Sequence, residues 1–525
     1  MPARLVLAVD HGTSGLKVAL VGDDGAVAGF AFEPTPIRFL PGGGAEQDPE
    51  DWWQALLRAA RRALDDVPGA RAAVGAVCVS STFSTTVAVD RDGAPVHPAL
   101  TWMDARGAAH VRRAVGGFPS LMGYGVARAL RWLRVAGGAP SLSGKDDCAH
   151  ALWLRHERPD AWARTATLLP SKDWLNLRLT GVTAASTDSV QLFWATDTRD
   201  PRAVRWDDGL LRLLGLDRER LPRLVAPTDV LGPLRADVAD GLGLARDVPV
   251  VAGSPDHQCA LVGSGAVTPF AAHLYVGTSS WLECPLPWRK VDPLHQIAAF
   301  PSPLPGTYQL VDEQDLAGGA LAWLGDAVLF RAVGLLGGTP PAAPWTTLDE
   351  LAARAPAGCD GVLFAPWLNG ERTPVDDHRL RGAFVGLSAS TTVEHLVRAV
   401  LEGVALNTRW MLGHVERFVG RRLDPIRLVG GGGQSAPWAQ ILADVLGRTI
   451  HRVRDPLAAN ARGAAFVAAL GLGWRRVDEL AALVPVDAVH APDPATRALH
   501  DDRFAAFRRL HRGIRGLFRA RGGQP

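Results

Sequence analysis

Two carboxylates stand at the ends of apolar runs that are typical of buried strands. LVLAVD ends in Asp10, and VPVVAGSPD delivers Asp256 in a turn that holds no other charge. Open α/β sheets carry ligands at the carboxyl ends of their strands, where loops hold the reacting side chains. Asp256 could serve as a general base, or it could cap a helix by accepting hydrogen bonds from its first N–H groups. Position alone favours the cap, because capping Asp residues far outnumber catalytic ones.

Gly-Thr-Ser occurs twice between apolar runs, at residues 12–14 and 277–279. Such turns leave backbone N–H groups and hydroxyls pointing outward, an arrangement that suits phosphate oxygens. A plain hairpin turn is the simpler interpretation of either copy alone. Two similar β-turn-β units, each opening a domain, predict duplication of one fold around a cleft.

A run of four glycines follows a third apolar segment, in RLVGGGGQS at residues 427–435. The run matches neither the dinucleotide fingerprint nor the Walker A loop. Backbone that approaches a flat ligand closely needs residues without Cβ. We therefore favour a loop that contacts a nucleotide over a structural turn.

Charged residues accompany turns and tryptophans elsewhere in the chain. Glu371 and Arg372 in NGERTP suggest an exposed turn with a local ion pair, which would stabilise little. A charged pair beside Trp can bind a sugar edge or begin a solvated helix, and spacing does not decide between the two. The pairs of this kind are Asp104 and Arg106 after Trp102, and Lys172 and Asp173 before Trp174.

The elements that must position these residues alternate between strands and helices. Residues 5–33 predict an antiparallel three-stranded meander, and residues 46–64 predict a helix with acids in its first turn. Residues 73–90 predict two strands around a polar turn. The chain is mostly helical from about 106 to 249, after which a strand restarts the pattern. This alternation is typical of an α/β sheet with helices on both faces.

Composition narrows the class of protein. At 525 residues the chain predicts two or three domains. A net charge of +2 argues against a basic face for nucleic acid or membrane. Five scattered cysteines without a CxxC pair argue against a zinc site or disulfide framework and favour a reducing cytosol. The N-terminal apolar run is too short for a signal peptide, and no segment is expected to reach the length of a membrane span.

Eight segments, taken together and in order, resemble the FGGY family of carbohydrate kinases, and the overall pattern is closest to xylulokinases. The similarity runs from about residue 5 to residue 470. The segments are VDHGTS, EQDPEDWW, PSKDWLNLRLTG, GSPDHQCALVGSG, VGTSS, NGERTP, GAFVGLSASTTVEHLVRAVLEG and GGGGQS.

The resemblance implies an α/β fold with two actin/Hsp70-like (ribonuclease H-like) ATPase domains flanking a deep cleft. Residues 1–250 would form the sugar-binding domain, and residues 251–525 the nucleotide-binding domain with a C-terminal helical tail. The implied reaction transfers the ATP γ-phosphoryl group to a sugar hydroxyl with Mg²⁺. The implied setting is cytoplasmic, without nucleic acid or membrane partners, and family members are often dimers, so a homodimer is one option.

The resemblance also assigns roles to residues. Asp256 occupies the position of the catalytic base, and Asp10 would hold Mg²⁺ through water. The residues expected at ATP and its phosphates are Asp10, Gly12, Thr13, Ser14, Lys17, Gly277, Thr278, Ser279, Gly431, Gly432, Gly433 and Ser435. The residues expected at the sugar are Thr82, Phe83, Ser84, Trp102, Asp104 and Asp256.

Two departures from the xylulokinase pattern fall on the sugar side. Thr82-Phe83-Ser84-Thr85 stands where xylulokinases carry Gln-Met-His-Gly, and Ala149-His150 stands where a Pro-Lys pair is expected. Sites that hydrogen-bond a particular hydroxyl discriminate strongly, so these changes bear on the acceptor. A pentulose such as D-xylulose is the first candidate, and another ketose, a polyol or an aldonate (ribulose, erythritol or gluconate type) remains open.

Two other classes of protein share this fold. One is a catalytically weak regulator that binds sugar and ATP, which the altered sugar-side segment motivates and the presence of Asp10 and Asp256 disfavours. The other is a chaperone-like or filament ATPase, against which the GERTP and SPDHQ segments argue. The segment after about Gly471 predicts a basic amphipathic helix that packs on the body of the protein, followed by a frayed tail.

Overall fold

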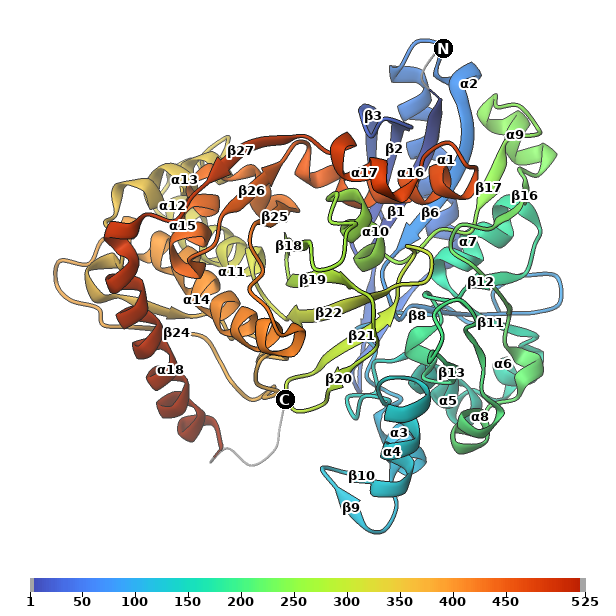
Figure 1. The fold of residues 1–525 in the computed structure, drawn as a ribbon, viewed down its shortest axis with the longest axis horizontal. Coiled ribbons are helices and arrows are strands. Elements are labelled where there is room, and N and C mark those ends of the chain that lie inside the picture. Colours follow the sequence, from blue (N-terminus) through green and yellow to red (C-terminus); the bar gives the residue numbers. More distant parts are fainter. Residues whose placement is uncertain (1–3, 520–525) are drawn as a thin grey trace.

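The computed structural model describes residues 4–519 and divides into two α/β lobes (Figure 1). One lobe is built from the first half of the chain, coloured blue to green, and the other from the second half, coloured yellow to red. Each lobe is centred on one large mixed sheet.

The N-terminal lobe contains a six-stranded sheet in the order β16-β17-β6-β1-β2-β3. Neighbours β1, β2 and β3 are antiparallel, which confirms the predicted meander, while β6 and β17 run parallel to β1. The strands are β1 Leu5–Gly12, β2 Gly15–Gly22, β3 Val27–Pro34, β6 Val74–Ser81, β16 Val230–Pro233 and β17 Pro249–Val251.

The C-terminal lobe contains an eight-stranded sheet in the order β20-β21-β22-β19-β18-β25-β26-β27. Its strands are β18 Ala272–Val276, β19 Ser280–Leu286, β20 Val291–Asp292, β21 Ile297–Pro301, β22 Tyr308–Gln314, β25 Ile426–Val429, β26 Ile450–Val453 and β27 Val486–His490. Six of them, β27-β26-β25-β18-β19-β22, repeat the order and the strand directions of β16-β17-β6-β1-β2-β3. The duplication predicted from the two Gly-Thr-Ser turns is therefore confirmed at the level of whole sheets.

Helices flank both sheets. The predicted N-terminal helix is α1 Pro49–Asp66, where Asp48 caps the N-terminus and a buried face that includes Trp52 packs on β2 and β3. In the C-terminal lobe α14 Val393–Val419 and α15 Ala436–Leu446 pack on each other, and α13 Pro344–Arg354 packs on both. These buried helical faces supply most of the apolar core of each lobe.

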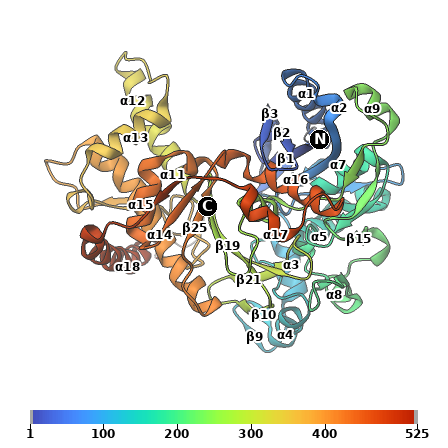
Figure 2. The same cartoon turned by 45° about the horizontal axis from the view of Figure 1, so that its top comes forward.

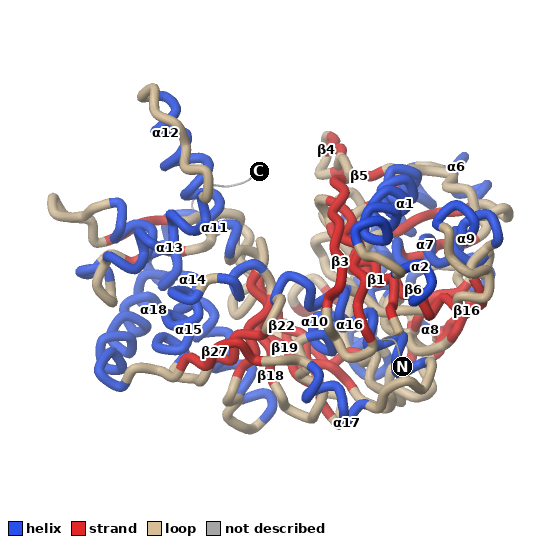
Figure 3. The backbone as a smooth tube through the Cα atoms, turned by 90° about the horizontal axis from the view of Figure 1, so that it is seen from above, coloured by secondary structure: helices blue, strands red, loops and turns tan. Residues whose placement is uncertain are grey.

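Two helices, α10 Asp256–Gly263 and α16 Ala459–Gly471, cross between the sheets (Figure 3). A Cβ on Gly263 would lie 1.8 Å from the Ala459 carbonyl oxygen, and one on Gly463 would lie 1.8 Å from the Cys259 carbonyl oxygen. Only glycine permits this approach. Although α16 comes late in the chain, it packs against β1, β2 and β6 of the N-terminal sheet.

Between the N-terminal strands and β17, the chain forms a second layer around a five-stranded sheet, β11-β7-β8-β5-β4. The two strands predicted in residues 73–90 are β6 and β7 Thr86–Val89, which belong to different sheets. The other strands are β4 Arg38–Leu40, β5 Gly44–Gln47, β8 Ala99–Leu100 and β11 Thr167–Pro170. The region expected to be mostly helical holds helices in less than half of its residues, with short strands among them, so that expectation is wrong. Its helices are α3 Ala108–Val115, α4 Val126–Val135, α5 Asp147–Glu157, α6 Pro159–Arg164, α7 Ser171–Thr180, α8 Asp208–Leu214 and α9 Ala236–Leu242.

One helical stretch, Gly318–Leu335, is long and apolar enough to cross a membrane by length and composition alone, so the expectation that no segment reaches that length is wrong. It comprises α11 Gly318–Ala322, a π-helical turn and α12 Phe330–Leu335, and α12 projects from the lobe (Figure 2). Ala320, Leu321 and Leu324 belong to the core of the C-terminal lobe, so the stretch begins inside the fold.

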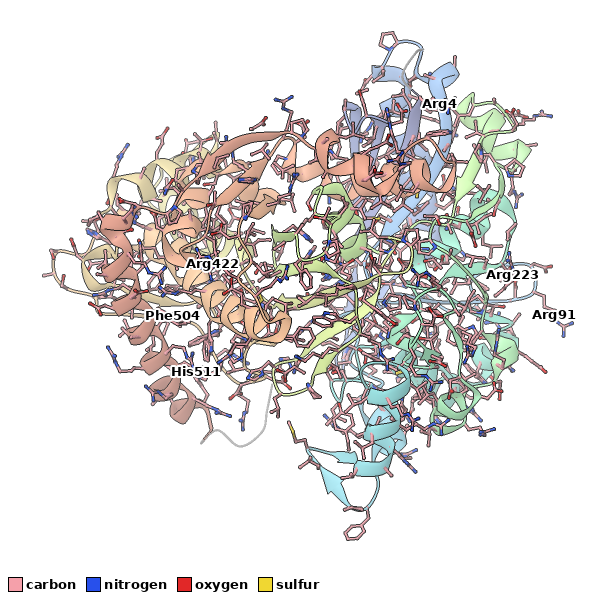
Figure 4. The ribbon with its side chains drawn as sticks, viewed as in Figure 1. Arg4, Arg91, Arg223, Arg422, Phe504 and His511 are labelled. Atoms are coloured by element: carbon pink, nitrogen blue, oxygen red, sulfur yellow. The ribbon has the colours of Figure 1, made fainter. Side chains whose placement is uncertain are left out.

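The predicted C-terminal helix is α18 Arg497–Arg519, and it packs against the body of the lobe as expected. The His511 ring lies 4.9 Å from the Trp410 ring of α14, and Arg409 of α14 lies over Phe504 (Figure 4). The expected frayed tail falls on residues 520–525, outside the described part of the chain.

Candidate active site

Asp256 is the first residue of α10 and directly follows the loop that leaves β17. The N-cap position belongs to Pro255, and no side chain caps this helix. The Asp256 Oδ1 accepts only the N–H of its neighbour His257, at 2.9 Å. The capping interpretation is therefore wrong, because the carboxylate satisfies none of the deeper N–H groups of the helix.

The loop before Asp256 is held from several directions. Gly253 has φ 74°, and a Cβ there would lie 2.0 Å from the Val79 carbonyl oxygen. The Ala252 carbonyl accepts from Lys172 Nζ at 3.0 Å and from Asn176 Nδ2 at 2.7 Å. Ser254 Oγ donates to Asp188 at 2.6 Å. Asp256 is thus presented by a backbone that has little freedom to move.

Lys172 and Asp173 form neither a sugar-binding edge nor a solvated helix start. Both are buried, their side chains join at 2.5 Å, and Asp173 also accepts from Ser189 Oγ at 2.5 Å. A buried pair of this kind is costly to break, since the remaining charge would be stranded. The pair supports the Asp256 loop from behind.

The surroundings of Asp256 set its acidity. Burial raises the pKa of the carboxyl to about 6, and the nearby carboxylates of Asp10 and Glu313 add to the rise, while His257 opposes it. A general base works best with a pKa near the operating pH. Asp256 is consequently ionised at neutral pH and is a better base than an exposed aspartate.

Asp10 lies in β1 just before the first Gly-Thr-Ser turn and is buried. Lys17 Nζ, on β2, donates to Asp10 Oδ2 at 2.9 Å, and Asn460 Nδ2 of α16 donates to Asp10 Oδ1 at 3.3 Å. Asp10 raises the pKa of Lys17, and Asp256 and Tyr275 contribute to that rise. Asp10 and Lys17, which are expected at the nucleotide, therefore lie close enough to Asp256 for their charges to interact with it.

Both Gly-Thr-Ser segments are hairpin turns, between β1 and β2 and between β18 and β19. Their carbonyl groups are occupied: Gln47 Nε2 donates to the Thr13 oxygen at 3.0 Å, and the amides of Ala317 and Gly318 donate to the oxygens of Thr278 and Gly277 at 2.8 Å. Within the described residues, the amides of Thr13 and Thr278 donate to no other group. Ser14 and Thr278 are exposed, and Gly12 and Ser279 are half-buried. The turns therefore offer donors, not acceptors, which suits phosphate.

Two of the residues expected at the sugar, Trp102 and Thr82, lie beside the first turn. Trp102 Nε1 donates to Thr13 Oγ1 at 2.8 Å, and the Thr82 amide donates to the His11 carbonyl at 3.0 Å. Phe83 packs edge-on against His257, with ring centroids 5.7 Å apart. Ser84 has φ 52° and donates to the Lys145 carbonyl at 2.6 Å. A non-glycine residue in this region of φ is uncommon, and such residues cluster at functional sites.

Asp104 and His150 lie behind that surface. Asp104 is buried, and its carboxylate accepts hydrogen bonds from the guanidinium of Arg106 at 2.6 Å and from the Ala45 amide at 2.9 Å. His150 is fully buried between Thr86 Oγ1 and the Asp104 carbonyl, and burial lowers its pKa to about 4. His150 is 0% exposed, so its ring is not available to a ligand.

The four glycines turn the chain from β25 into α15. A Cβ on Gly430 would meet the Val276 carbonyl at 2.6 Å, one on Gly432 would meet the Val276 side chain at 2.5 Å, and one on Gly433 would meet Pro456 at 2.8 Å. Packing therefore requires three of the four glycines. The length of the glycine run is for this reason weaker evidence for a loop that contacts a nucleotide. Gly431 is exposed, and a Cβ there would come no closer than 4.0 Å to Leu457 and Val276; Ser435 caps α15 by accepting the Trp438 amide at 3.1 Å.

Glu371 and Arg372 do not form the expected local ion pair. Glu371 is buried and accepts from the Asp315 amide at 3.1 Å and from Asn407 Nδ2 at 2.5 Å, and burial together with Asp315 raises its pKa to about 8. Arg372 instead pairs with Glu313 and, at 3.3 Å, with Asp315. The sequence did not suggest Glu313 or Asp315, because they lie about 60 residues from Arg372 and carry no motif of their own.

Two duplicated α/β lobes, each with a hairpin turn that holds a free amide, and a half-buried carboxylate between them define an actin-like ATPase fold adapted to phosphoryl transfer. Residues 5–115 and 147–263 match the N-terminal domain of the FGGY family of carbohydrate kinases, and residues 273–472 match its C-terminal domain. The chain belongs to this family and is an ATP-dependent sugar kinase, a phosphotransferase with an alcohol group as acceptor.

The relatives to which the chain is similar are named as kinases of different sugars. The chain is 30% identical to the xylulose kinase of Escherichia coli over 523 residues, covering 97% of this chain and 99% of that one. It is 25% identical to the gluconokinase of Bacillus subtilis over 451 residues, covering 84% and 82%. The xylulose kinase of Rhodospirillum rubrum matches in structure with a TM-score of 0.81 at 27% identity, covering 98% and 100%.

Proposed function

We propose that this chain phosphorylates a hydroxyl of a small sugar, with a pentulose such as D-xylulose as the first candidate and Asp256 as the base. The observation that carries the proposal is the position of Asp256, which is half-buried, fixed by its loop and close to Asp10 and Lys17. A carboxylate within hydrogen-bond reach of a hydroxyl accepts its proton as the hydroxyl attacks phosphorus.

The rest of the site would position the phosphates. The free amides of the two Gly-Thr-Ser turns would bind phosphate oxygens, and Lys17 adds a positive charge on the same side as Asp10. Gly431 offers open backbone where the adenosine is expected. Phosphoryl transfer depends mainly on positioning and charge neutralisation, which these groups supply.

The described residues suit Mg²⁺ that arrives with the nucleotide. They contain no group of three or more His, Cys, Asp or Glu side chains that could hold a metal by themselves. Mg²⁺ is usually held by one or two carboxylates together with phosphates and water. Asp10 is the residue that would hold it, and the ion would neutralise charge on the phosphates. Because Lys17 and Asn460 already contact both Asp10 oxygens, contact through water suits Asp10 best.

The acceptor follows from the relatives and from the sugar-side surface. The similarity to xylulose kinases supports a pentulose, whereas the similarity to a gluconokinase supports an aldonate. Phe83 packs against His257, the residue after Asp256, and the short Ser84 side chain donates to the Lys145 carbonyl. These features leave D-xylulose as the first candidate and make a direct comparison of acceptors necessary.

The test is sugar-stimulated ADP release with MgATP over a panel of ketoses, polyols and aldonates. The proposal expects the highest kcat/KM for a pentulose, with D-xylulose first. A higher kcat/KM for gluconate or glycerol would overturn the choice of pentulose and leave the kinase intact. ATP binding with no turnover on any acceptor would instead favour a regulator on this fold.

The cysteines support a cytoplasmic setting. All five are free and buried, as expected of a protein that works in a reducing compartment. Cell fractionation tests this proposal, and recovery of the protein outside the cytoplasmic fraction would contradict it.

A further inference from the structure

A buried cluster of polar side chains lies directly behind Asp256 and takes no part in the chemistry above. His257 Nδ1 lies 2.6 Å from Glu283 Oε1. Gln309 Nε2 donates to Glu283 Oε2 at 2.8 Å, and His273 Nε2 lies 3.5 Å from the same oxygen. Glu283, His273 and Gln309 are 0% exposed, and His257, on α10 between the lobes, is 7% exposed, so the cluster is almost entirely closed to solvent.

Only one histidine of this cluster can be the positive partner of Glu283. A buried carboxylate is costly unless it is paired with a charge and hydrogen-bonded. Burial and, to a smaller extent, the charge of His257 lower the pKa of His273 to about 3, so His273 is neutral. Burial also lowers the pKa of His257, but Glu283, with smaller contributions from Asp256 and Glu313, raises it to about 9. The same contact opposes the rise that burial imposes on the pKa of Glu283.

The His257 ring is fixed as well as charged. Trp281 stacks on it with ring centroids 4.2 Å apart, and Phe83 packs on it edge-on at 5.7 Å. Tyr275 in turn stacks on Trp281 at 3.9 Å. Aromatic faces attract a cation, so the stack favours the imidazolium form. The positive charge of the cluster therefore lies on the His257 ring, in the residue next to Asp256.

We propose that Glu283 and His257 form a positioning pair that keeps a fixed positive charge beside Asp256 and so holds this carboxylate ionised across neutral pH. The inference rests on the proposed role of Asp256. Asp10 and Glu313 both act against ionisation of Asp256, and His257 is the neighbouring group that opposes them. Without its charge, the base would be protonated over more of the neutral range.

Other ionisable groups face the same region and stay in place when Glu283 is replaced. They come from each neighbouring element and are Asp10 on β1, Lys17 on β2, His273 and Tyr275 on β18, and Glu313 on β22. A difference in the pH dependence of kcat/KM between the wild type and a Glu283 variant therefore reports on the pair formed by Glu283 and His257.

The kinetic test is the pH profile of kcat/KM for Glu283→Gln, which keeps the shape of the side chain and removes its charge. An opposite charge within about 4–6 Å shifts a pKa by about 1–3 units, so loss of the imidazolium should move the acidic limb upward by about one pH unit. Glu402→Gln is the matched control, because Glu402 is a buried carboxylate of α14 that bonds Arg398 at 2.8 Å, outside this cluster. If kcat/KM falls at the same acidic pH in Glu283→Gln as in the wild type, the proposal is overturned.

A second measurement does not depend on turnover. Nuclear magnetic resonance of ¹³C-labelled histidine, with the His257 signal assigned by its loss in His257→Gln, should show a protonated ring at pH 7.5 in the wild type and a neutral ring in Glu283→Gln. A neutral His257 in the wild type would refute the pair even if the enzyme is active. The double variant His257→Gln/Glu283→Gln leaves no stranded charge and keeps the kinetic test available if a single variant fails to fold.

The two proposals can fail separately. If Asp256→Asn retains sugar-stimulated turnover, the role of Asp256 as base is lost, whatever the charge of His257. If Asp256→Asn is inactive while Glu283→Gln keeps the wild-type acidic limb, only the positioning pair is lost.

Discussion

Asp256 shows how much of the behaviour of a residue comes from its surroundings. Its carboxylate stands at the first position of a helix, where the macrodipole favours negative charge, yet its pKa is raised to about 6. Burial and the carboxylates of Asp10 and Glu313 outweigh both the helix and His257. The result is a carboxylate that is ionised at neutral pH but holds a proton more readily than a free aspartate.

The raised pKa predicts the direction of the pH dependence. Asp256 must be ionised to accept a proton, so turnover should be present above its pKa of about 6 and should fall tenfold per pH unit below it. The measurement is kcat/KM for the best acceptor between pH 5 and pH 8 at saturating MgATP. A profile that stays flat down to pH 5 would mean that Asp256 is not the base or is not shielded from water.

At the scale of elements, the sequence predicted those strands, helices and turns whose formation depends on residues close together in the chain. The three-stranded meander, the helix after Asp48 and the two hairpin turns follow from alternation, capping and glycine-containing turns, all of which involve residues close in sequence. The family resemblance also identified Asp256, which the residue pattern alone interpreted as a cap. The structure shows no capping bond there.

The interactions that join distant elements could not be predicted in the same way. Arg372 meets Glu313 and Asp315 instead of its neighbour Glu371, and Glu283 on β19 meets His257 on helix α10. Neither pairing has a spacing that sequence periodicity could detect. The four glycines were interpreted as a ligand loop, although three of them are needed for contact with Val276 and Pro456.

The loop before Asp256 gives a prediction at this scale. Gly253→Ala should lower kcat and destabilise the fold, because its φ of 74° disfavours a side chain and the new Cβ would lie 2.0 Å from the Val79 carbonyl oxygen. We expect a loss of about 1–3 kcal/mol in the free energy of unfolding, measured by urea denaturation.

Gly413→Ala is the matched control for this substitution. Gly413 is exposed on α14, and a Cβ there would contact nothing within 4 Å. Alanine should stabilise this helix position by about 0.5–1 kcal/mol and leave kcat unchanged. Equal effects of the two substitutions would contradict the account of the loop.

At the scale of the whole molecule, two copies of one sheet face each other, and α10 and α16 cross between them. The crossing depends on Gly263 and Gly463, whose helices approach too closely for side chains. Asp256 begins one of these helices, and Asn460, which contacts Asp10, lies in the other. The junction of the lobes and the proposed site of chemistry are therefore parts of one structure.

The crossing predicts a joint loss of stability and activity. Gly463→Val would place a side chain within 1.8 Å of the Cys259 carbonyl, so the helices must separate. Overpacking of this kind costs about 1–3 kcal/mol, and we expect a lower Tm together with weaker MgATP binding, because Asp10 and Asn460 would shift. Calorimetry of unfolding and of nucleotide binding checks both, and an unchanged nucleotide affinity would contradict the link between crossing and site.

The most direct test of the central claim compares wild type and Asp256→Asn in sugar-stimulated ADP release with the best acceptor of the panel. The substitution keeps the size of the side chain and removes its ability to accept the proton. The account predicts that turnover falls by about 10²–10⁴-fold while MgATP binding and Tm stay close to those of the wild type. Turnover within a few-fold of the wild type, with the fold intact, would show that Asp256 is not the base.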